Sequence, residues 1–169
     1  MRHLKLLFVA AVLIIGTSTM NAQDSKVAHI NTQELVQAMP EMKAAQSQLE
    51  KLQQTYDTEI KAMLKEWDTK VKQYDAEADS KTEEENRKRI EEVQGMQKNI
   101  NDYRQQAVQD LQKKEIDLFR PILEKAKGAI QKVARAKGYV YVLDSSEGNG
   151  VILADGKDLL ADVKTEMGI

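Results

Sequence analysis

The sequence predicts an α+β protein that is mainly α: a long antiparallel helical hairpin joined to a small body that contains short strands. The middle of the chain is rich in Ala, Glu, Lys, Gln and Leu, the composition of long helices, whereas aromatic residues make up only 5% of the chain. Apolar residues recur at helical spacing on both sides of one break near residue 80. Short strand-like segments flank this helical region on both sides.

The first 22 residues have the pattern of a secretory signal peptide. Arg2 and Lys5 precede an unbroken apolar run over 6–15, which is short for a membrane span. We expect cleavage after Ala22 and export; an N-terminal membrane anchor is the alternative. Without Arg2 and Lys5 the mature chain has 23 basic and 27 acidic residues, a net charge of −4. This charge argues against a nucleic-acid partner.

Nothing in the sequence predicts catalysis, a cofactor or a metal site. The chain has no Cys, which excludes disulfides, thiolate zinc sites and thiol chemistry. His29 is the only His of the mature chain and has no partners at metal-ligand spacing. The acidic run 83–85 is better explained as a helix start than as a cation site, because carboxylates stabilise the positive end of a helix. We therefore expect a non-enzymatic protein.

The mature chain begins with a predicted strand over 26–30. Asn31 or Thr32 can cap the helix that follows, and Pro40 can occupy the first turn of the next one.

Two long helices are predicted on either side of a break at 79–82. In the first, apolar residues are separated by steps of three and four that form an eleven-residue repeat, which favours nearly straight helix pairing. Its members are Leu49, Leu52, Tyr56, Ile60, Met63, Trp67, Val71, Tyr74 and Ala78. The second helix, which Thr82 or Ser80 can cap, carries Ile90, Val93, Met96, Ile100, Tyr103, Ala107, Leu111, Leu118 and Ile122.

A single fold-back point pairs nearly the whole apolar stripe. Residues at equal distance from residue 80 should face each other, which sets Trp67 opposite Val93. Pro40 and Pro121 fall at the same level, and Pro121 should kink its helix because it lacks an N–H. We therefore predict an arm over 41–120 with its tip near 79–82, and a body formed by 23–40 and 121–169.

Beyond Pro121 the helix should end at Gly138. A strand over 139–143, a turn over 144–150 and a strand over 151–154 predict a β-hairpin. Asp158 can cap a last short helix.

The stretches KVAHINTQELVQAMPEMKAAQSQL at 26–49 and PILEKAKGAIQKVARAKGYVYVLD at 121–144 resemble the Skp/OmpH family. Residues 151–163 are similar to its last strand and helix, so the resemblance covers essentially the whole mature chain. It implies a periplasmic homotrimer joined at a β-rich trimerisation body. Between its helical arms the trimer would hold unfolded outer-membrane β-barrel proteins without ATP, with the outer-membrane assembly machinery as a further partner.

The resemblance directs attention to two groups of residues. Leu64 lies off the arm seam and is a candidate client contact; Met63, Trp67 and Met96 are candidates too, although packing within the arm explains them more simply. The candidates for the trimer body are Val27, His29, Ile30, Tyr139, Tyr141, Leu143, Val151 and Leu153.

The sequence departs from the family in two places. Leu160 stands where the family often has a capping Thr. The arm tip, residues 75–92, has eight acidic and four basic residues, which argues against contact with anionic lipid. A second hypothesis is a structural or adaptor coiled-coil protein of an envelope assembly, although an adaptor usually carries further β domains beside its hairpin.

Overall fold

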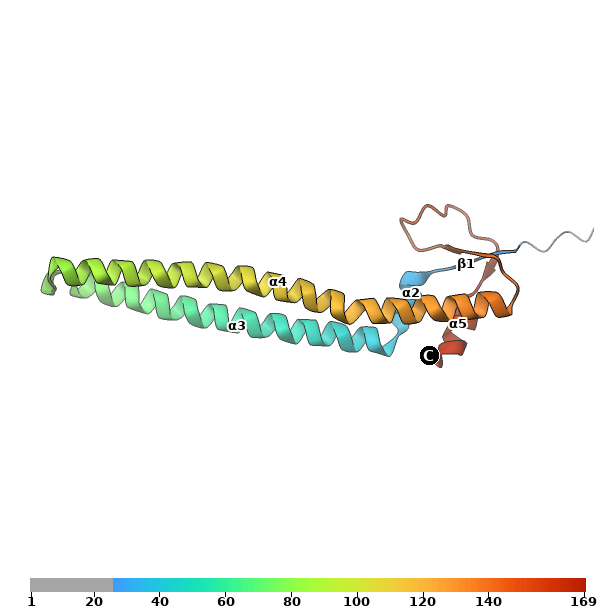
Figure 1. Ribbon diagram of the computed structural model, residues 1–169, viewed down its shortest axis with the longest axis horizontal. Coiled ribbons are helices and arrows are strands. Elements are labelled where there is room, and N and C mark those ends of the chain that lie inside the picture. The colour runs from blue at the N-terminus through green and yellow to red at the C-terminus, as the bar shows by residue number, and fades with distance from the viewer. Residues whose placement is uncertain (1–25) are drawn as a thin grey trace, which may run out of the picture.

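The computed structural model describes residues 26–169; the expected signal peptide and its cleavage site lie outside the described residues. Figure 1 shows a long two-helix arm with the remaining elements gathered at one end. In chain order the elements are β1 Val27–Ile30, α2 Thr32–Ala38, α3 Pro40–Glu77, the 3-10 turn η1 Ala78–Ser80, α4 Glu83–Ala136, β2 Tyr141–Asp144, β3 Lys157–Asp158 and α5 Leu160–Met167. The mainly helical α+β class is confirmed.

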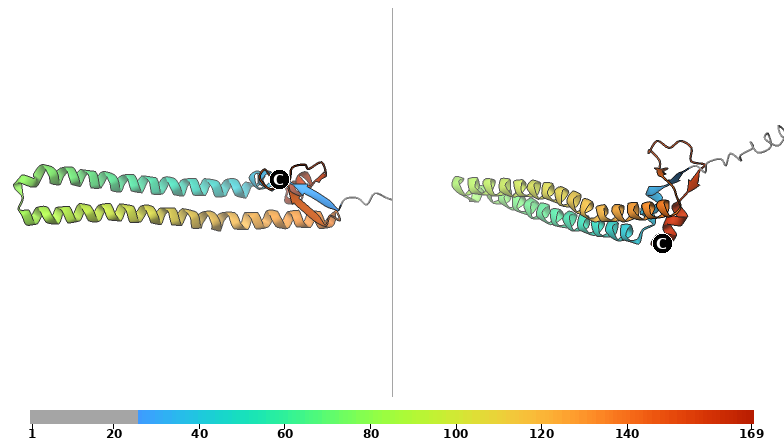
Figure 2. Two further views of the ribbon diagram at one scale, coloured as in Figure 1. Left: turned by 90° about the horizontal axis from the view of Figure 1, so that it is seen from above. Right: turned by 45° about the vertical axis from the view of Figure 1, so that its right-hand side comes forward.

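The arm is the predicted antiparallel hairpin, and contacts across it confirm the fold-back point. The indole Nε1 of Trp67 donates a hydrogen bond to the carbonyl of Val93 at 3.1 Å. The rings of Tyr56 and Tyr103 meet edge to face, with centroids 5.8 Å apart. Seen from above in Figure 2, α3 and α4 run side by side along the whole arm.

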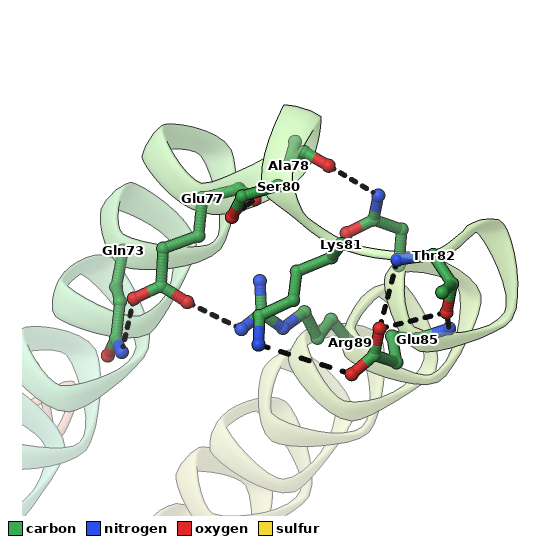
Figure 3. A network of polar contacts seen from close by, with 9 residues as sticks. Gln73, Glu77, Ala78, Ser80, Lys81, Thr82, Glu85 and Arg89 are labelled. Atoms are coloured by element: carbon green, nitrogen blue, oxygen red, sulfur yellow. Dashed lines mark hydrogen bonds and ion pairs between the residues drawn. The ribbon is translucent and has the colours of Figure 1, made fainter.

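The tip is closed by polar contacts (Figure 3). Thr82 caps α4 in a capping box, in which its side chain accepts from the N–H of Glu85 and the Glu85 carboxylate accepts from the N–H of Thr82. Arg89 reaches back across the tip to Glu77 at 2.5 Å and lies over the ring of Tyr74. These contacts fix the turn without any apolar core.

The base of the arm is the level at which α4 bends. The helix is continuous through Pro121, and Figure 2 shows it changing direction where its colour passes from yellow to orange. At this level Lys125 of α4 forms an ion pair with Glu41 of α3. α4 then continues past α3 and supports the other elements of the body.

The body contains a three-stranded sheet with the order β2-β1-β3, in which β1 is parallel to both neighbours. The predicted β-hairpin over 139–154 is wrong, because residues 151–154 form no strand and the third strand is β3. β2 and β3 lie on either side of β1 and run in the same direction. The chain must therefore return from the end of β2 to the start of β3, and residues 145–156 make this connection.

One face of the sheet packs on the helices. Ala28 and Ile30 point inward from β1. The four helices, with the residues that precede α3 and α5, add the rest of the core: Leu35, Met39, Met42, Ala45, Ile122, Ala126, Val133, Ala134, Leu159 and Val163. Within residues 26–169, none of the helices has the length and apolarity that crossing a membrane requires.

The last helix, α5, packs on α4. Its N-cap is Leu159, which has no capping side chain, and not Asp158 as predicted. From one residue further upstream, the side chain of Asp158 accepts a hydrogen bond from the N–H of Leu160 at 2.8 Å.

Candidate functional site

The outer face of the sheet is a candidate interaction surface. Val27 is paired with Tyr141 and His29 with Leu143, so these four side chains share the face that points away from the helices. Tyr141 is 65% exposed and Leu143 47%. These four of the eight body candidates from the sequence therefore lie together on one surface.

Two of the other candidates lie elsewhere. Ile30 is buried in the core on the opposite face of the sheet, and Tyr139 packs against that core. The sequence could not separate them from the outer face, because both strands are apolar at nearly every position and show no clean alternation.

The return segment 145–156 carries the remaining candidates. Ile152 is fully exposed and Leu153 is 75% exposed, whereas Val151 is half-buried. Figure 1 shows this segment arching away from α4 on the far side of the sheet. Ile152 and Leu153 are therefore left largely uncovered by the rest of residues 26–169.

A cluster of hydrogen bonds fixes the start of this segment to the sheet. The carboxylate of Asp144 accepts from the hydroxyls of Thr32 and Ser146, both at 2.6 Å, and from the amide of Asn149 at 2.7 Å. Burial alone would raise the pKa of Asp144, but the hydroxyls and backbone N–H groups of Ser146 and Thr32 lower it to about 2.

His29 connects the two ends of the segment. Its Nδ1 lies 3.3 Å from the hydroxyl of Ser145, and its Nε2 lies 3.2 Å from the carbonyl oxygen of Gly156. Since a carbonyl only accepts, Nε2 carries the proton. Within residues 26–169, no three side chains of the types that bind metals are grouped together.

The client-contact candidates all lie on the arm. Met63, Leu64, Trp67 and Met96 are half-buried, and Trp67 is held in the seam by its bond to Val93. The assignment of these four residues to client binding stays a prediction.

The arm also exposes apolar residues that the sequence reasoning did not propose as contacts. Ile90, Val108, Ile116 and Leu123 are each more than half exposed, and the last two lie on the body-side half of α4. Val108 and Ile116 fall outside the seam pattern altogether. Together with Phe119 and Leu123 they have the spacing of residues on one face of a helix. The sequence pattern could therefore have predicted this second apolar face.

Both the sequence and the fold are similar to those of known proteins. A family model described as outer membrane protein (OmpH-like) matches residues 26–167. The fold is similar to the crystal structure of a candidate OmpH-like outer membrane chaperone from Caulobacter crescentus CB15, with a TM-score of 0.76, 18% identity and 86% of each chain covered. No curated protein matches the sequence significantly.

Proposed function

Because the chain belongs to the OmpH-like family of outer membrane proteins, we propose that it is an ATP-independent holdase chaperone of the periplasm. It would bind unfolded outer-membrane β-barrel proteins between the arms of a trimer and prevent their aggregation. The sequence has no phosphate-binding loop, so binding would be passive and release would follow from client folding or transfer to a better partner, such as the outer-membrane assembly machinery. A non-enzymatic role agrees with this mechanism.

The observation that carries the proposal is the combination of a two-helix arm with an incompletely covered body. Residues 23–40 and 121–169 are too few to bury a self-sufficient core comfortably. β2 and β3 are both edge strands, and the outer sheet face and Ile152 meet solvent. Three copies joined at this surface would cover it and leave three arms around a shared cavity.

Multi-angle light scattering of the mature protein tests the proposal, alone and with a urea-diluted outer-membrane β-barrel. We expect a trimer that keeps the client soluble in a defined complex. A stable monomer, or a trimer that lets the client precipitate, would contradict the proposal and favour the adaptor hypothesis.

The double variant Ile152→Asp/Leu153→Asp tests the self-association surface. Both side chains are exposed, so the fold of the single chain should persist while the trimer dissociates, because burying two carboxylates at an interface is unfavourable. Ile90→Asp, at an exposed position near the arm tip, is the matched control and should leave the trimer mass unchanged.

We also propose that residues 1–22 direct export and are removed. Mass spectrometry of the protein from the periplasmic fraction should give the mass of a chain that starts at Gln23. An intact N-terminus in the membrane fraction would instead support the anchor.

A further inference from the structure

One face of α4 near the body combines two parallel rows of side chains. Ile116, Leu123 and Ile130 form an apolar row, and Lys113, Arg120 and Lys127 form a basic row. Neighbours within each row are seven residues apart, or nearly two helical turns, so each row runs along one side of the helix. We call these six residues the basic–apolar face.

This face is distinct from the arm seam. The seam side of α4 carries Ala107 and Ile122, which are buried against α3 or the body. Ile116 and Leu123 remain 52% and 51% exposed. Ile130, by contrast, is half-buried and packs against the core of the body. The exposed apolar part of this second side therefore consists of Ile116 and Leu123.

The basic–apolar face is also hollowed. Ile116, Phe119, Arg120, Leu123 and Lys127 line a groove of about 660 Å³. Leu123 and Lys127 also line a neighbouring pocket of about 560 Å³ between α4 and β2, which Ile130 and Arg135 help to form. The two hollows together give an apolar track. Arg120, Lys127 and Arg135 lie along it, with Glu115 and Glu124 at the rim of the groove.

The charge of this region is the opposite of that of the chain as a whole. Residues 113–137 contain eight basic and three acidic residues, a net of +5, whereas the mature chain has a net of −4. Lys113 is paired with Asp117, but neither Arg120 nor Lys127 forms an ion pair with a described residue. Glu115 and Glu124 line only the groove, not the neighbouring pocket.

These charges argue against a second copy of α4 as the partner. Two such helices packed in parallel and in register would bring Arg120 and Lys127 against identical cations, which is unfavourable. Carboxylates spaced between apolar side chains would instead match both rows of the basic–apolar face. Such a match needs no fixed sequence, because the groove is shallow and its cationic side chains are long and flexible.

We propose that the basic–apolar face of α4 binds segments of unfolded polypeptide that combine apolar and acidic side chains. This inference rests on the proposed holdase function. It specifies which client segments the arm would bind and which surface of the arm would bind them. The contacts lie close to the body, where the arms of an assembled molecule converge, and not at the acidic tip.

Fluorescence anisotropy with a labelled, unstructured peptide of Leu, Phe and Asp tests the proposal, with a peptide carrying Lys in place of Asp as the comparison. The wild type should prefer the acidic peptide, and added salt should weaken that preference. Ile116→Ser/Leu123→Ser should weaken binding roughly tenfold, equivalent to about 1.4 kcal/mol. Arg120→Glu/Lys127→Glu should abolish the preference for Asp over Lys.

Matched controls lie elsewhere on the arm. Ile90→Ser removes an equally exposed apolar residue, and Lys61→Glu/Lys65→Glu reverses two exposed charges on α3. Both should bind the acidic peptide as the wild type does. Equal losses in the controls would show non-specific binding and would overturn the assignment.

Two further outcomes would also overturn it. If Ile116→Ser/Leu123→Ser changes the solution mass measured by light scattering, the face is a contact between copies. If the face binds anionic phospholipid vesicles and the peptide does not compete, its partner is a lipid surface. Client solubility separates this site from the holdase function. If both double variants keep a β-barrel client soluble as well as the wild type does, the holdase function stands and only this site is refuted.

Discussion

At the scale of single residues, Asp144 is a carboxylate that holds several parts of the body together. Asp144 is the last residue of β2. Its carboxylate accepts hydrogen bonds of 2.6 to 2.7 Å from Thr32, at the start of α2, and from Ser146 and Asn149 in the return segment. A hydrogen bond to a charged group contributes more than one between neutral groups. The position of the exposed residues 152 and 153 therefore depends on one side chain that lies several residues away.

We predict that Asp144→Ala lowers the free energy of unfolding by about 2 kcal/mol, because it removes the acceptor shared by two hydroxyls, the Asn149 amide and two backbone N–H groups. Urea unfolding followed by circular dichroism measures this change. Asp155→Ala, in the same segment and without these bonds, should have little effect. An equal effect of both substitutions would contradict the role given to Asp144.

The same carboxylate makes stability sensitive to acid. Its pKa is lowered from 3.8 to about 2 in the folded protein, so its contribution is fully present above about pH 4. That contribution is lost as the pH falls from about 4 through 2, where the folded carboxylate takes up a proton. In the Asp144→Ala variant, the decrease in stability over this interval should be smaller than in the wild type.

At the scale of elements, α4 carries a residue that weakens it. Gly95 lies inside the helix, and a Cβ placed there would meet no atom within 4 Å. Gly95→Ala should therefore raise the free energy of unfolding by about 1 kcal/mol, since Gly is the poorer helix former. Gly138→Ala is the opposing control. Gly138 follows α4 with a φ of +77°, and a side chain there should cost about 1 kcal/mol. Thermal melting of both variants, compared with the wild type, measures both changes.

The elements also show how far local sequence determines structure. The eleven-residue repeat correctly predicted the arm helices and their pairing. The prediction succeeded because one fold-back point has to match apolar residues across some forty residues of each helix. The strand predicted over 151–154 failed because an apolar, β-branched run specifies extended backbone but not a pairing partner. Within residues 26–169 this run pairs with no strand, although β2, the strand expected to be its partner, has a free edge.

The candidate sites divide in the same way. Side chains alternate between the two faces of a strand, but the sequence does not give the register of β1 against β2. Only that register shows that Val27, His29, Tyr141 and Leu143 lie on one face. On the arm, the seam pattern drew attention to Met63 and Trp67 and away from Ile116, which lies outside that pattern. A residue outside the dominant stripe is the better contact candidate, because a seam residue already has a partner.

At the scale of the whole molecule, charge and length are distributed unevenly along the arm. The body-side part of α4 has a net charge of +5 over 113–137, and the tip has a net charge of −4 over 75–92. α3, with 38 residues, extends about 57 Å from the body. In the proposed trimer, such an arm would present its cationic surface to a bound chain near the body, and the acidic tips of neighbouring arms would repel one another.

Shortening the arm separates the contribution of its length from that of its surface. Deleting 56–66 from α3 together with 94–104 from α4 removes one eleven-residue repeat from each helix, about three turns or 16 Å. The seam stays in register, and the body and the basic–apolar face are untouched. We predict an unchanged oligomer mass and an affinity for the acidic peptide within about twofold of the wild type, with a lower capacity to keep a whole β-barrel client soluble, because a smaller volume is enclosed.

Deleting nine residues from each helix, 56–64 and 96–104, is the matched control. Nine residues are two and a half turns, so the outer part of each apolar stripe would point away from its partner. This variant should lose helical circular dichroism at a lower temperature than the eleven-residue deletion, although the two arms are nearly equal in length. If the eleven-residue deletion kept full client capacity, holding would depend on the surface near the body alone, and enclosure by long arms would not be part of the mechanism.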